Sequence, residues 1–375
     1  MTGIIKVKLT LEDGTIYHGR SFGSPVAAAG EVVFNTAMTG YPESLTDPSY
    51  RGQILCLTYP LVGNYGAPAK SEENDLYRFY ESSSIHISGL IVSDYSFEYS
   101  HWNATESLDE WLKRNNVPGI YGIDTRALTK RIRENGAMLG KVEPEGTGIG
   151  YYDPNKVNLV AEVSVHEKRI YGSGKYKILL VDCGVKYNII RNLLKRDTTI
   201  IRVPWDYDFH NEEFDGLFLS NGPGDPKMCS STIENIRKAF EGKKPIFGIC
   251  LGNQLMALAS GADTYKLKYG HRSHNQPVLQ VGTDKAYITS QNHGFAVDNK
   301  TLGKDWEPLF ININDQTNEG MMHKTMPFFS TQFHPEASGG PTDTGYLFDV
   351  FIENIEKSKN PQTSFFYPPT PQMGG

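Results

Sequence analysis

Apolar and polar positions alternate differently in the early and late parts of the chain. Residues 9–19 alternate as two strands around a tight turn at Asp13-Gly14, which is a strong hairpin signal. The sequence next predicts a helix opened by Ser107 and Glu110, the two side chains of a capping box. A second helix is expected over 124–136, where a glycine ends it. The expected short β segments between these features are 31–36, 53–58 and 86–93.

From residue 176 onward, apolar runs alternate with helical patterns. This alternation is typical of a parallel sheet with helices on both faces. The expected strands are 177–182, 199–203, 216–220, 245–249 and 328–334. The expected helices are 188–195, 233–240, 255–260 and 346–357. Beyond residue 264 the pattern predicts shorter β segments. The predicted fold class is therefore α/β, with a mainly parallel sheet covered by helices on both faces in the late part.

Glycine, proline, aspartate and asparagine are frequent over residues 141–175, where no long periodic signal is found. We therefore place an inter-domain crossing at 151–175, between an N-terminal α+β domain over 1–150 and a second domain over 176–360. Residues 361–375 are rich in proline and predict a linker-like tail.

Composition narrows the class of protein. A chain of 375 residues suggests about two domains. Its formal net charge of −6 argues against nucleic-acid or membrane partners, and the basic stretch 130–133 is interpreted as one face of a helix. No apolar run reaches the ~18 residues of a membrane span. The start of the chain lacks a secretory or transit pattern. Four scattered cysteines without CxxC spacing predict no disulfide framework, no metal site and a cytoplasmic location.

One cysteine stands apart from the others. Cys250 lies between Gly248 and Gly252, at the join of a predicted strand and a predicted helix. A nucleophile on such a sharp corner needs small neighbours, and the N-terminus of a helix favours a thiolate. The following amide, that of Leu251, would face an oxyanion formed by attack on a carbonyl. Free cysteines are more often buried structural residues, but the glycine-flanked corner favours a nucleophile here.

The other three cysteines carry weaker signals. Cys56 and Cys183 lie in or just after apolar strands and are interpreted as structural, whereas Cys229, in a polar loop, gives no indication either way.

A cysteine nucleophile needs a base, and the base needs a group that orients it. His334 is the best candidate among ten histidines because it ends a predicted strand and is followed by Glu336. In an extended chain, residues two apart project to the same side, so Glu336 would hold the imidazole as the acid of a catalytic triad does. A histidine that only caps a strand end beside a surface glutamate is the alternative.

Two glycine-containing loops are further candidates. The loop around Gly222 and Gly224 follows a predicted strand and could direct backbone N–H groups at the same oxyanion. The loop around Asn292 and Gly294 gives a weak indication of a ligand site.

These motifs match known families in order and spacing. FGICLGNQL around Cys250, FHPE at 333–336 and SNGPGDP at 220–226 resemble the class-I, triad-type glutamine amidotransferase domain. Further segments are similar to the glutaminase subunit of carbamoyl-phosphate synthetase and extend the resemblance over nearly the whole chain. They are GEVVFNTAMTGYPESLTDPSY at 30–50, LTYPLVGNYG at 57–66, YGIDTRALTK at 121–130 and QNHGFAV at 291–297.

The resemblance implies roles for the matching positions. Cys250 would be the nucleophile, His334 the acid and base, and Glu336 its orienter. The residues that would contact glutamine are Ser49, Gly222, Gly224, Leu251, Gln254, Asn292, Gly294 and Phe295. Asn253 stands where many members carry histidine, and we expect little effect from that difference because it lies outside the catalytic set.

The function implied is hydrolysis of L-glutamine, with the ammonia passed through a tunnel to a partner. That partner would be a carbamoyl-phosphate synthetase large subunit or a fused synthetase domain acting for pyrimidine or arginine synthesis. No phosphate-binding loop is recognised, so no cofactor is expected in this chain, and ATP and Mg²⁺ are expected on the partner. Two alternatives remain open: a catalytically silent docking or regulatory module of the synthetase, and a cysteine-dependent γ-glutamyl hydrolase. The proline-rich tail favours a fused polypeptide over a free subunit.

Overall fold

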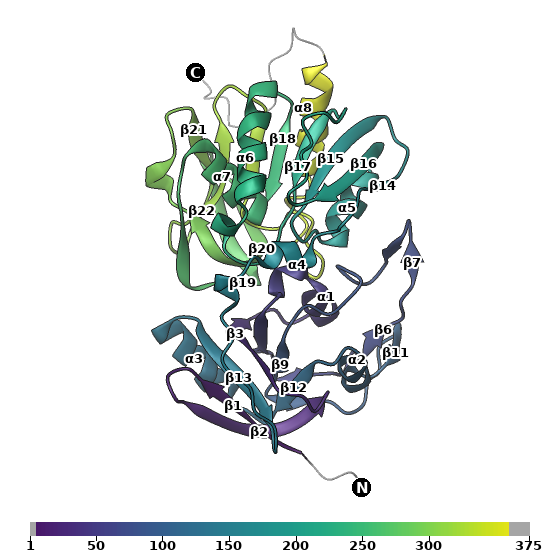
Figure 1. Cartoon of the computed structure of the whole chain (residues 1–375), viewed down its shortest axis with the longest axis vertical. Helices are drawn as coiled ribbons and strands as arrows, with labels where there is room; N and C mark the ends of the chain where they lie inside the picture. The colour runs from purple at the N-terminus through teal and green to yellow at the C-terminus, as the bar shows by residue number, and fades with distance from the viewer. Residues whose placement is uncertain (1–4, 360–375) are drawn as a thin grey trace. The chain divides into compact units, whose positions relative to one another are not determined.

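The computed structural model describes residues 5–359 and divides the chain into two compact units (Figure 1). The first unit comprises Met1–Leu159 together with Lys268–Arg272, and the second comprises Val160–Leu267 with Ser273–Gly375. The expected tail at 361–375 lies outside the described residues. Among those described, no helix is long and apolar enough to cross a membrane.

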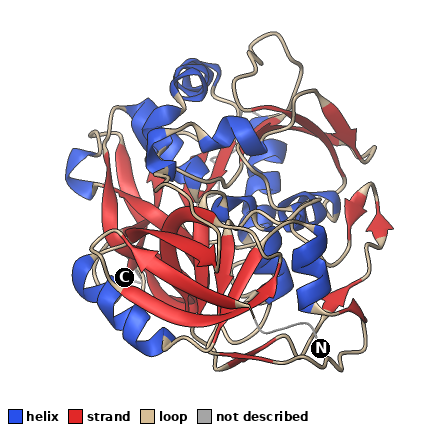
Figure 2. Cartoon of the chain, turned by 60° about the horizontal axis from the view of Figure 1, so that its bottom comes forward, coloured by secondary structure: helices blue, strands red, loops and turns tan. Residues whose placement is uncertain are grey.

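The first unit is built on a closed barrel of β-strands (Figure 2). In barrel order these strands are β1 (Lys6–Leu11), β13 (Met138–Pro144), β3 (Ala28–Asn35), β4 (Gln53–Leu57), β9 (Gly89–Ile91), β12 (Pro118–Tyr121) and β2 (Ile16–Gly23). The hairpin predicted around Asp13-Gly14 is confirmed, since β1 and β2 pair antiparallel across it and Gly14 has a φ of +86°. Inside the barrel, Leu9, Val32 and Ile120 are fully buried.

Short elements and helices surround the barrel strands. The short strands are β5 (Leu61–Val62), β6 (Ala67–Pro68), β7 (Glu72–Glu73), β8 (Leu76–Tyr77), β10 (Asp94–Tyr95) and β11 (Ala104–Glu106). The helices are α1 (Tyr41–Thr46), α2 (Leu108–Arg114) and α3 (Thr125–Asn135), with a 3₁₀ turn at Pro48–Tyr50. The predicted capping box is confirmed, because Ser107 and Glu110 exchange both hydrogen bonds at the start of α2. Helix α3 ends at Gly136, as expected.

The second unit contains a ten-stranded sheet. Its order is β14 (Arg169–Tyr171), β16 (Thr198–Pro204), β15 (Tyr176–Asp182), β17 (Gly216–Leu219), β18 (Ile246–Ile249), β23 (Phe328–Thr331), β22 (Asn318–His323), β21 (Trp306–Asn312), β19 (Thr264–Gln280) and β20 (Ala286–Val297). Strands from β16 to β23 pair parallel, whereas β14, β22 and β21 pair antiparallel. The sheet is therefore mixed, and the expected parallel arrangement holds for its centre.

The part of the sheet after residue 264 differs from the expectation of short β segments. Strand β19 has 17 residues and β20 has 12. Strands β21, β22 and β23 follow one another through short connections, which join neighbours in antiparallel pairs only. This accounts for the antiparallel side of the sheet.

Helices of the second unit are α4 (Leu159–Val163, which begins at the last residue of the first unit), α5 (Tyr187–Leu194), α6 (Ser230–Ala239), α7 (Leu251–Ser260) and α8 (Leu347–Ser358). Short 3₁₀ turns lie at Pro154–Lys156 in the first unit and at Pro226–Met228, Phe240–Gly242 and Asn299–Thr301 in the second. Leu217 and Leu219 of β17 belong to the core cluster that also holds Leu255 of α7. Phe218, between them, stacks on Phe348 of α8.

Candidate active site

Cys250 lies at a sharp corner between β18 and α7. It is the N-cap of α7, and its backbone has φ 55° and ψ −101°, a conformation that non-glycine residues rarely adopt. Its own N–H donates to the carbonyl of Thr331 at the end of β23, with 2.7 Å between the two atoms. The corner therefore has the geometry of a nucleophile elbow.

The two glycines beside Cys250 are required by close backbone approach. A Cβ atom at Gly248 would lie 2.7 Å from the carbonyl carbon of Gly252. A Cβ atom at Gly252 would lie 2.4 Å from the carbonyl oxygen of Leu219 on β17. The helix after the cysteine thus packs directly on the backbone of two neighbouring strands, and a side chain at either position would push it away.

The Cys250 thiol is enclosed. The residue is 2% exposed, and its Sγ lies 3.7 Å from the carbonyl oxygen of Asn292 on β20. As the N-cap of α7, Cys250 lies next to backbone N–H groups that have no partner within the helix.

The three other cysteines are buried as well, and burial raises their pKa values. The pKa rises to about 12 for both Cys56 and Cys229, and that of Cys183 is also raised. These thiols stay protonated at neutral pH and are poor nucleophiles.

His334 and Glu336 form a buried hydrogen bond, with 2.7 Å between Nδ1 and Oε1. The contact was expected from an extended chain, but β23 ends at Thr331 and residues 334–337 form a turn. The Ala337 N–H donates to the His334 carbonyl, which closes this turn. The His334–Glu336 contact therefore forms within a turn and not along an extended strand.

Neighbouring charged groups shift the pKa values of both His334 and Glu336. Burial alone would lower the pKa of His334, but the Glu336 carboxylate and Cys250 raise that pKa to about 10. Burial would raise the pKa of Glu336, but Lys186 and His334 lower it to about 2. The Nε2 atom of His334 has no hydrogen-bond partner among residues 5–359, and Cys250 contributes to the pKa of the same ring. The pair is therefore an imidazolium and a carboxylate at neutral pH.

Lys186 completes this charge arrangement, and no sequence pattern indicated it. Its Nζ donates to Glu336 Oε1 and to the carbonyl of Ala337, each at 2.9 Å, and its side chain is buried. A lysine just before a helix is ordinary in sequence, and its partner is 150 positions away. Only the folded structure reveals the contact.

Residues expected to contact glutamine lie in both units. In the second unit, the Nε2 of Gln254 donates to the carbonyl of Phe295 at 2.9 Å, which links α7 to the segment that holds Asn292 and Gly294. Leu251 directly follows the nucleophile. Ser49 lies in the first unit, in the 3₁₀ turn, where its N–H donates to Asp47.

The loop after β17 holds the two glycines expected near the oxyanion. A Cβ atom at Gly222 would lie 2.1 Å from the carbonyl of Cys183 and 2.7 Å from the Leu251 side chain, so this loop passes close to the start of α7. Gly224 has a φ of +85°, which explains its residue type. A glutamine-binding role for the whole set remains a prediction.

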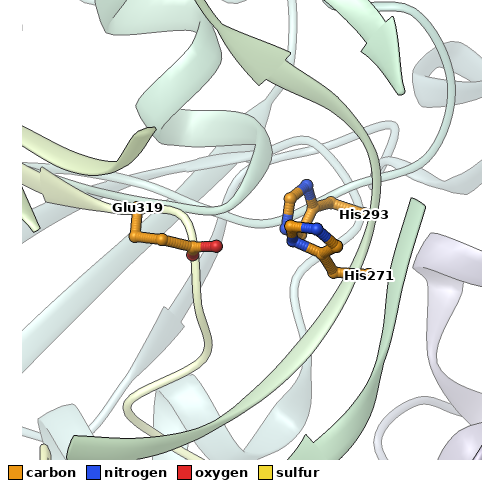
Figure 3. Close-up of side chains that lie close together, drawn as sticks. All are labelled: His271, His293 and Glu319. Atoms are coloured by element: carbon orange, nitrogen blue, oxygen red, sulfur yellow. The ribbon is translucent and has the colours of Figure 1, made fainter. Parts of the chain in front are cut away.

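His293 lies within the predicted glutamine-binding segment. Figure 3 shows it with His271 and Glu319, and possible ligand atoms of these three buried groups lie within 4.8 Å of one another. However, His293 Nδ1 is 2.7 Å from the Phe295 carbonyl, and its Nε2 is 3.0 Å from Gln291 Oε1. Each ring nitrogen of His293 thus faces an oxygen, and the contact with Phe295 helps to hold the 292–295 segment.

Two family models match separate parts of the chain. Residues 9–142 match the carbamoyl-phosphate synthase small chain, CPSase domain, and residues 179–354 match glutamine amidotransferase class-I. The arginine-specific small chain of carbamoyl phosphate synthase from Saccharomyces cerevisiae is 50% identical over 366 residues, which are 94% of this chain and 89% of that protein. The chain belongs to the carbamoyl-phosphate synthase small-chain family. This confirms the resemblance seen in the sequence.

Some other relatives are much longer than this chain. Multifunctional protein CAD of Squalus acanthias is 54% identical over 352 residues, but the match spans 16% of that protein and 92% of this chain. The human mitochondrial carbamoyl-phosphate synthase [ammonia] is 52% identical over 356 residues, which are 24% of that protein and 94% of this chain. The chain therefore spans less than a quarter of these relatives. Among solved structures, a glutamine amidotransferase from Thermotoga maritima is 19% identical with a TM-score of 0.37, covering 49% of this chain and 86% of that one.

Proposed function

We propose that this chain hydrolyses L-glutamine to glutamate and ammonia through a thioester at Cys250. The single observation that supports this most is the corner at Cys250, which places a thiol at the start of α7, near enough to the Glu336-bound His334 to raise the pKa of that imidazole. Nucleophile, base and orienting acid together form the arrangement that acyl transfer requires.

In the first step, the Cys250 thiolate attacks the side-chain carbonyl carbon of glutamine. Backbone N–H groups of Leu251 and of the loop with Gly222 and Gly224 stabilise the resulting oxyanion, and such a donor is typically worth roughly 2.7–4 kcal/mol of barrier. His334, held as an imidazolium, gives its proton to the leaving nitrogen. The C–N bond breaks, ammonia departs and a γ-glutamyl thioester remains.

In the second step, water attacks the thioester while His334, now neutral, takes a proton from it. The C–S bond breaks, glutamate leaves, and the sulfur and imidazole return to their starting state. Within the second unit, glutamine would be held by Gln254, Asn292, Gly294 and Phe295, whose amide and backbone groups suit its charged amino and carboxylate ends.

We propose that the ammonia passes to a synthetase partner, either a large subunit or a fused synthetase domain, that combines it with bicarbonate and ATP into carbamoyl phosphate. The name of the Saccharomyces cerevisiae relative, the arginine-specific small chain of carbamoyl phosphate synthase, supports this assignment. Enclosed transfer suits the chemistry because ammonia released into neutral water becomes ammonium and loses its nucleophilic lone pair. ATP and Mg²⁺ would bind to the partner, and the product would serve arginine or pyrimidine synthesis.

The experiment that tests the glutaminase is single-turnover hydrolysis of glutamine by the wild type and by Cys250→Ala, each with and without the synthetase. Glutamate release that depends on Cys250 supports the proposal. No such release, even with the synthetase, would indicate a silent regulatory module. Faster cleavage of γ-glutamyl peptides than of glutamine would indicate a γ-glutamyl hydrolase.

We make two further proposals, one about the sheet of the second unit and one about the location of the protein. We infer that helices cover both faces of the sheet, because Phe218 stacks on α8 while its neighbours Leu217 and Leu219 share a core with α7.

We also propose a cytoplasmic location, because the cysteines are scattered and all four are free thiols. Imaging of the tagged full-length protein would test it, and a mitochondrial signal would contradict it.

A further inference from the structure

A second buried ion pair joins β15 and β16, two neighbouring strands of the sheet in the second unit. Asp182, the last residue of β15, is fully buried and accepts from Arg202 of β16 at 2.8 Å to Nη2 and 3.1 Å to Nε. Asp182 also accepts the N–H of Val165 at 2.7 Å. Neither the resemblance nor the reaction scheme gives this pair a role. A buried ion pair is weak evidence of stabilisation by itself, since desolvation of the two charges offsets much of their attraction.

The same carboxylate organises the loop of residues 183–186 between β15 and α5. Its Oδ1 accepts the N–H of Gly184 at 3.0 Å and that of Val185 at 2.8 Å. The other two N–H groups of this loop are also held by side chains, those of Ser220 and Asn221. All four amides in a row are thus fixed, and Asp182 supplies half of the contacts.

This loop ends at Lys186, whose ammonium meets the candidate catalytic pair. Lys186 Nζ and His334 Nδ1 both bond to the same oxygen, Glu336 Oε1, at 2.9 and 2.7 Å. The position of the ammonium therefore determines where that oxygen lies against the imidazole. A shift in the loop would move Lys186, then Glu336, then the ring.

We propose that Asp182, paired with Arg202, is a positioning residue for glutamine hydrolysis that acts through Lys186 on the His334–Glu336 pair. This rests on the proposed function. The charged or titratable groups that face His334 are Glu336, Lys186, Cys250 and, on β19, His274. Of these, Lys186 is the one that the Asp182 loop places directly.

The expected effect on protonation follows from the charges. The Lys186 ammonium lowers the pKa of both His334 and Glu336. Removing it in Lys186→Met should move both limbs of the pH profile to higher pH. In Asp182→Asn the ammonium is present but less well placed, so the shift should have the same direction and be smaller.

The test is a double-mutant cycle on the full chain. Asp182→Asn, Lys186→Met and the double variant are compared by kcat and KM for glutamine. The pH dependence of Cys250 alkylation by iodoacetamide is measured in parallel, with Cys250→Ala as background. We expect Asp182→Asn to lower kcat by about tenfold with little change in KM, in the range known for groups that orient ligating residues. The double variant should match Lys186→Met alone, because both changes act on one route.

Controls separate positioning from folding. Asp349→Asn removes a surface carboxylate that also binds an arginine, Arg196, through two contacts, and should leave activity unchanged. Lys186→Arg keeps the charge and should restore part of the alkylation profile. If urea unfolding shows that Asp182→Asn does not fold, Arg202→Lys replaces it, since lysine keeps the charge but loses the two-pronged contact.

Two results would contradict the proposed positioning role. One is a loss of kcat in the double variant equal to the product of the two single losses. The other is an Asp182→Asn pH profile of Cys250 alkylation that is identical to that of the wild type. Alkylation requires no glutamine, so the positioning role can be tested even if the wild type does not hydrolyse glutamine. Absence of hydrolysis by the wild type would contradict the proposed function without contradicting the positioning of the His334–Glu336 pair.

Discussion

The imidazole of His334 and the carboxylate of Glu336 meet inside the second unit, with 2.7 Å between Nδ1 and Oε1. Because both groups are removed from water, their mutual attraction is stronger than at a surface. This contact keeps a proton on the ring at neutral pH, although burial alone would favour the neutral form. The leaving nitrogen of glutamine needs that proton.

Replacing Glu336 by glutamine should lower kcat strongly. We expect a loss of about 10⁴-fold, as for the equivalent change in a Ser–His–Asp triad, because the amide no longer stabilises the imidazolium. The pKa of His334 should fall, and the alkaline limb of the kcat–pH profile should move to lower pH. Steady-state glutaminase assays across pH measure both effects. The matched control is Glu234→Gln, a change at an exposed ion pair, and a Glu336→Gln enzyme as active as this control would contradict the assignment.

Stability should depend on pH through the same pair. The pKa of His334 rises from 6.5 to about 10, so its contribution is complete below about 6.5 and is lost as pH increases toward 10. The pKa of Glu336 falls from 4.5 to about 2, so its contribution is complete above about 4.5 and is lost on acidification toward 2. Urea unfolding of the wild type and of His334→Leu/Glu336→Leu should therefore differ most between about pH 4.5 and 6.5. A difference that is constant over pH would refute the linkage.

The candidate nucleophile could be predicted because its signals are local. Gly248, Cys250 and Gly252 are neighbours in sequence, and the strand and helix beside them have clear apolar patterns. The steric reason for each glycine, contact with the backbone of adjacent elements, agrees with the expected need for small residues. Local patterns likewise predicted the capping box at Ser107.

The supporting charges could not be predicted because their partners are distant. Lys186 and Glu336 are separated by 150 positions, and Asp182 and Arg202 come from different strands. The length of β19 was also missed, since its alternating polar residues resemble several short strands. Nonlocal pairing decides these features, and a single sequence carries no record of it.

Replacing Gly252 by alanine should destabilise the second unit. The new Cβ would lie 2.4 Å from the Leu219 carbonyl oxygen, which belongs to the sheet and cannot yield cheaply. Overpacking of this kind costs about 1–3 kcal/mol or more of unfolding free energy. Urea unfolding measures it, with Gly242→Ala as the control because nothing lies within 4 Å of that position. Equal midpoints for the two variants would show that the helix is free to move.

Gln254 and Asn253 are adjacent on α7 but should respond differently to alanine. Gln254 Nε2 donates to the Phe295 carbonyl at 2.9 Å and to Gln332 Oε1 at 3.1 Å, and loss of the first bond should loosen the predicted glutamine-binding segment. One hydrogen bond is worth about 0.5–1.5 kcal/mol, which corresponds to an increase in KM for glutamine of about 2- to 12-fold. Steady-state kinetics with glutamine measures this increase.

Asn253 is instead held in the core, where its Oδ1 accepts from Ser330 at 2.7 Å and its Nδ2 donates to Gln332 at 3.2 Å. Asn253→Ala should remove one hydrogen bond from each of these two partners and reduce the free energy of unfolding by about 1–3 kcal/mol, with KM for glutamine nearly unchanged. The two variants thus serve as controls for each other, one in kinetics and one in urea unfolding. If Asn253→Ala raised KM as much as Gln254→Ala, the side of α7 that faces glutamine would have to be reassigned.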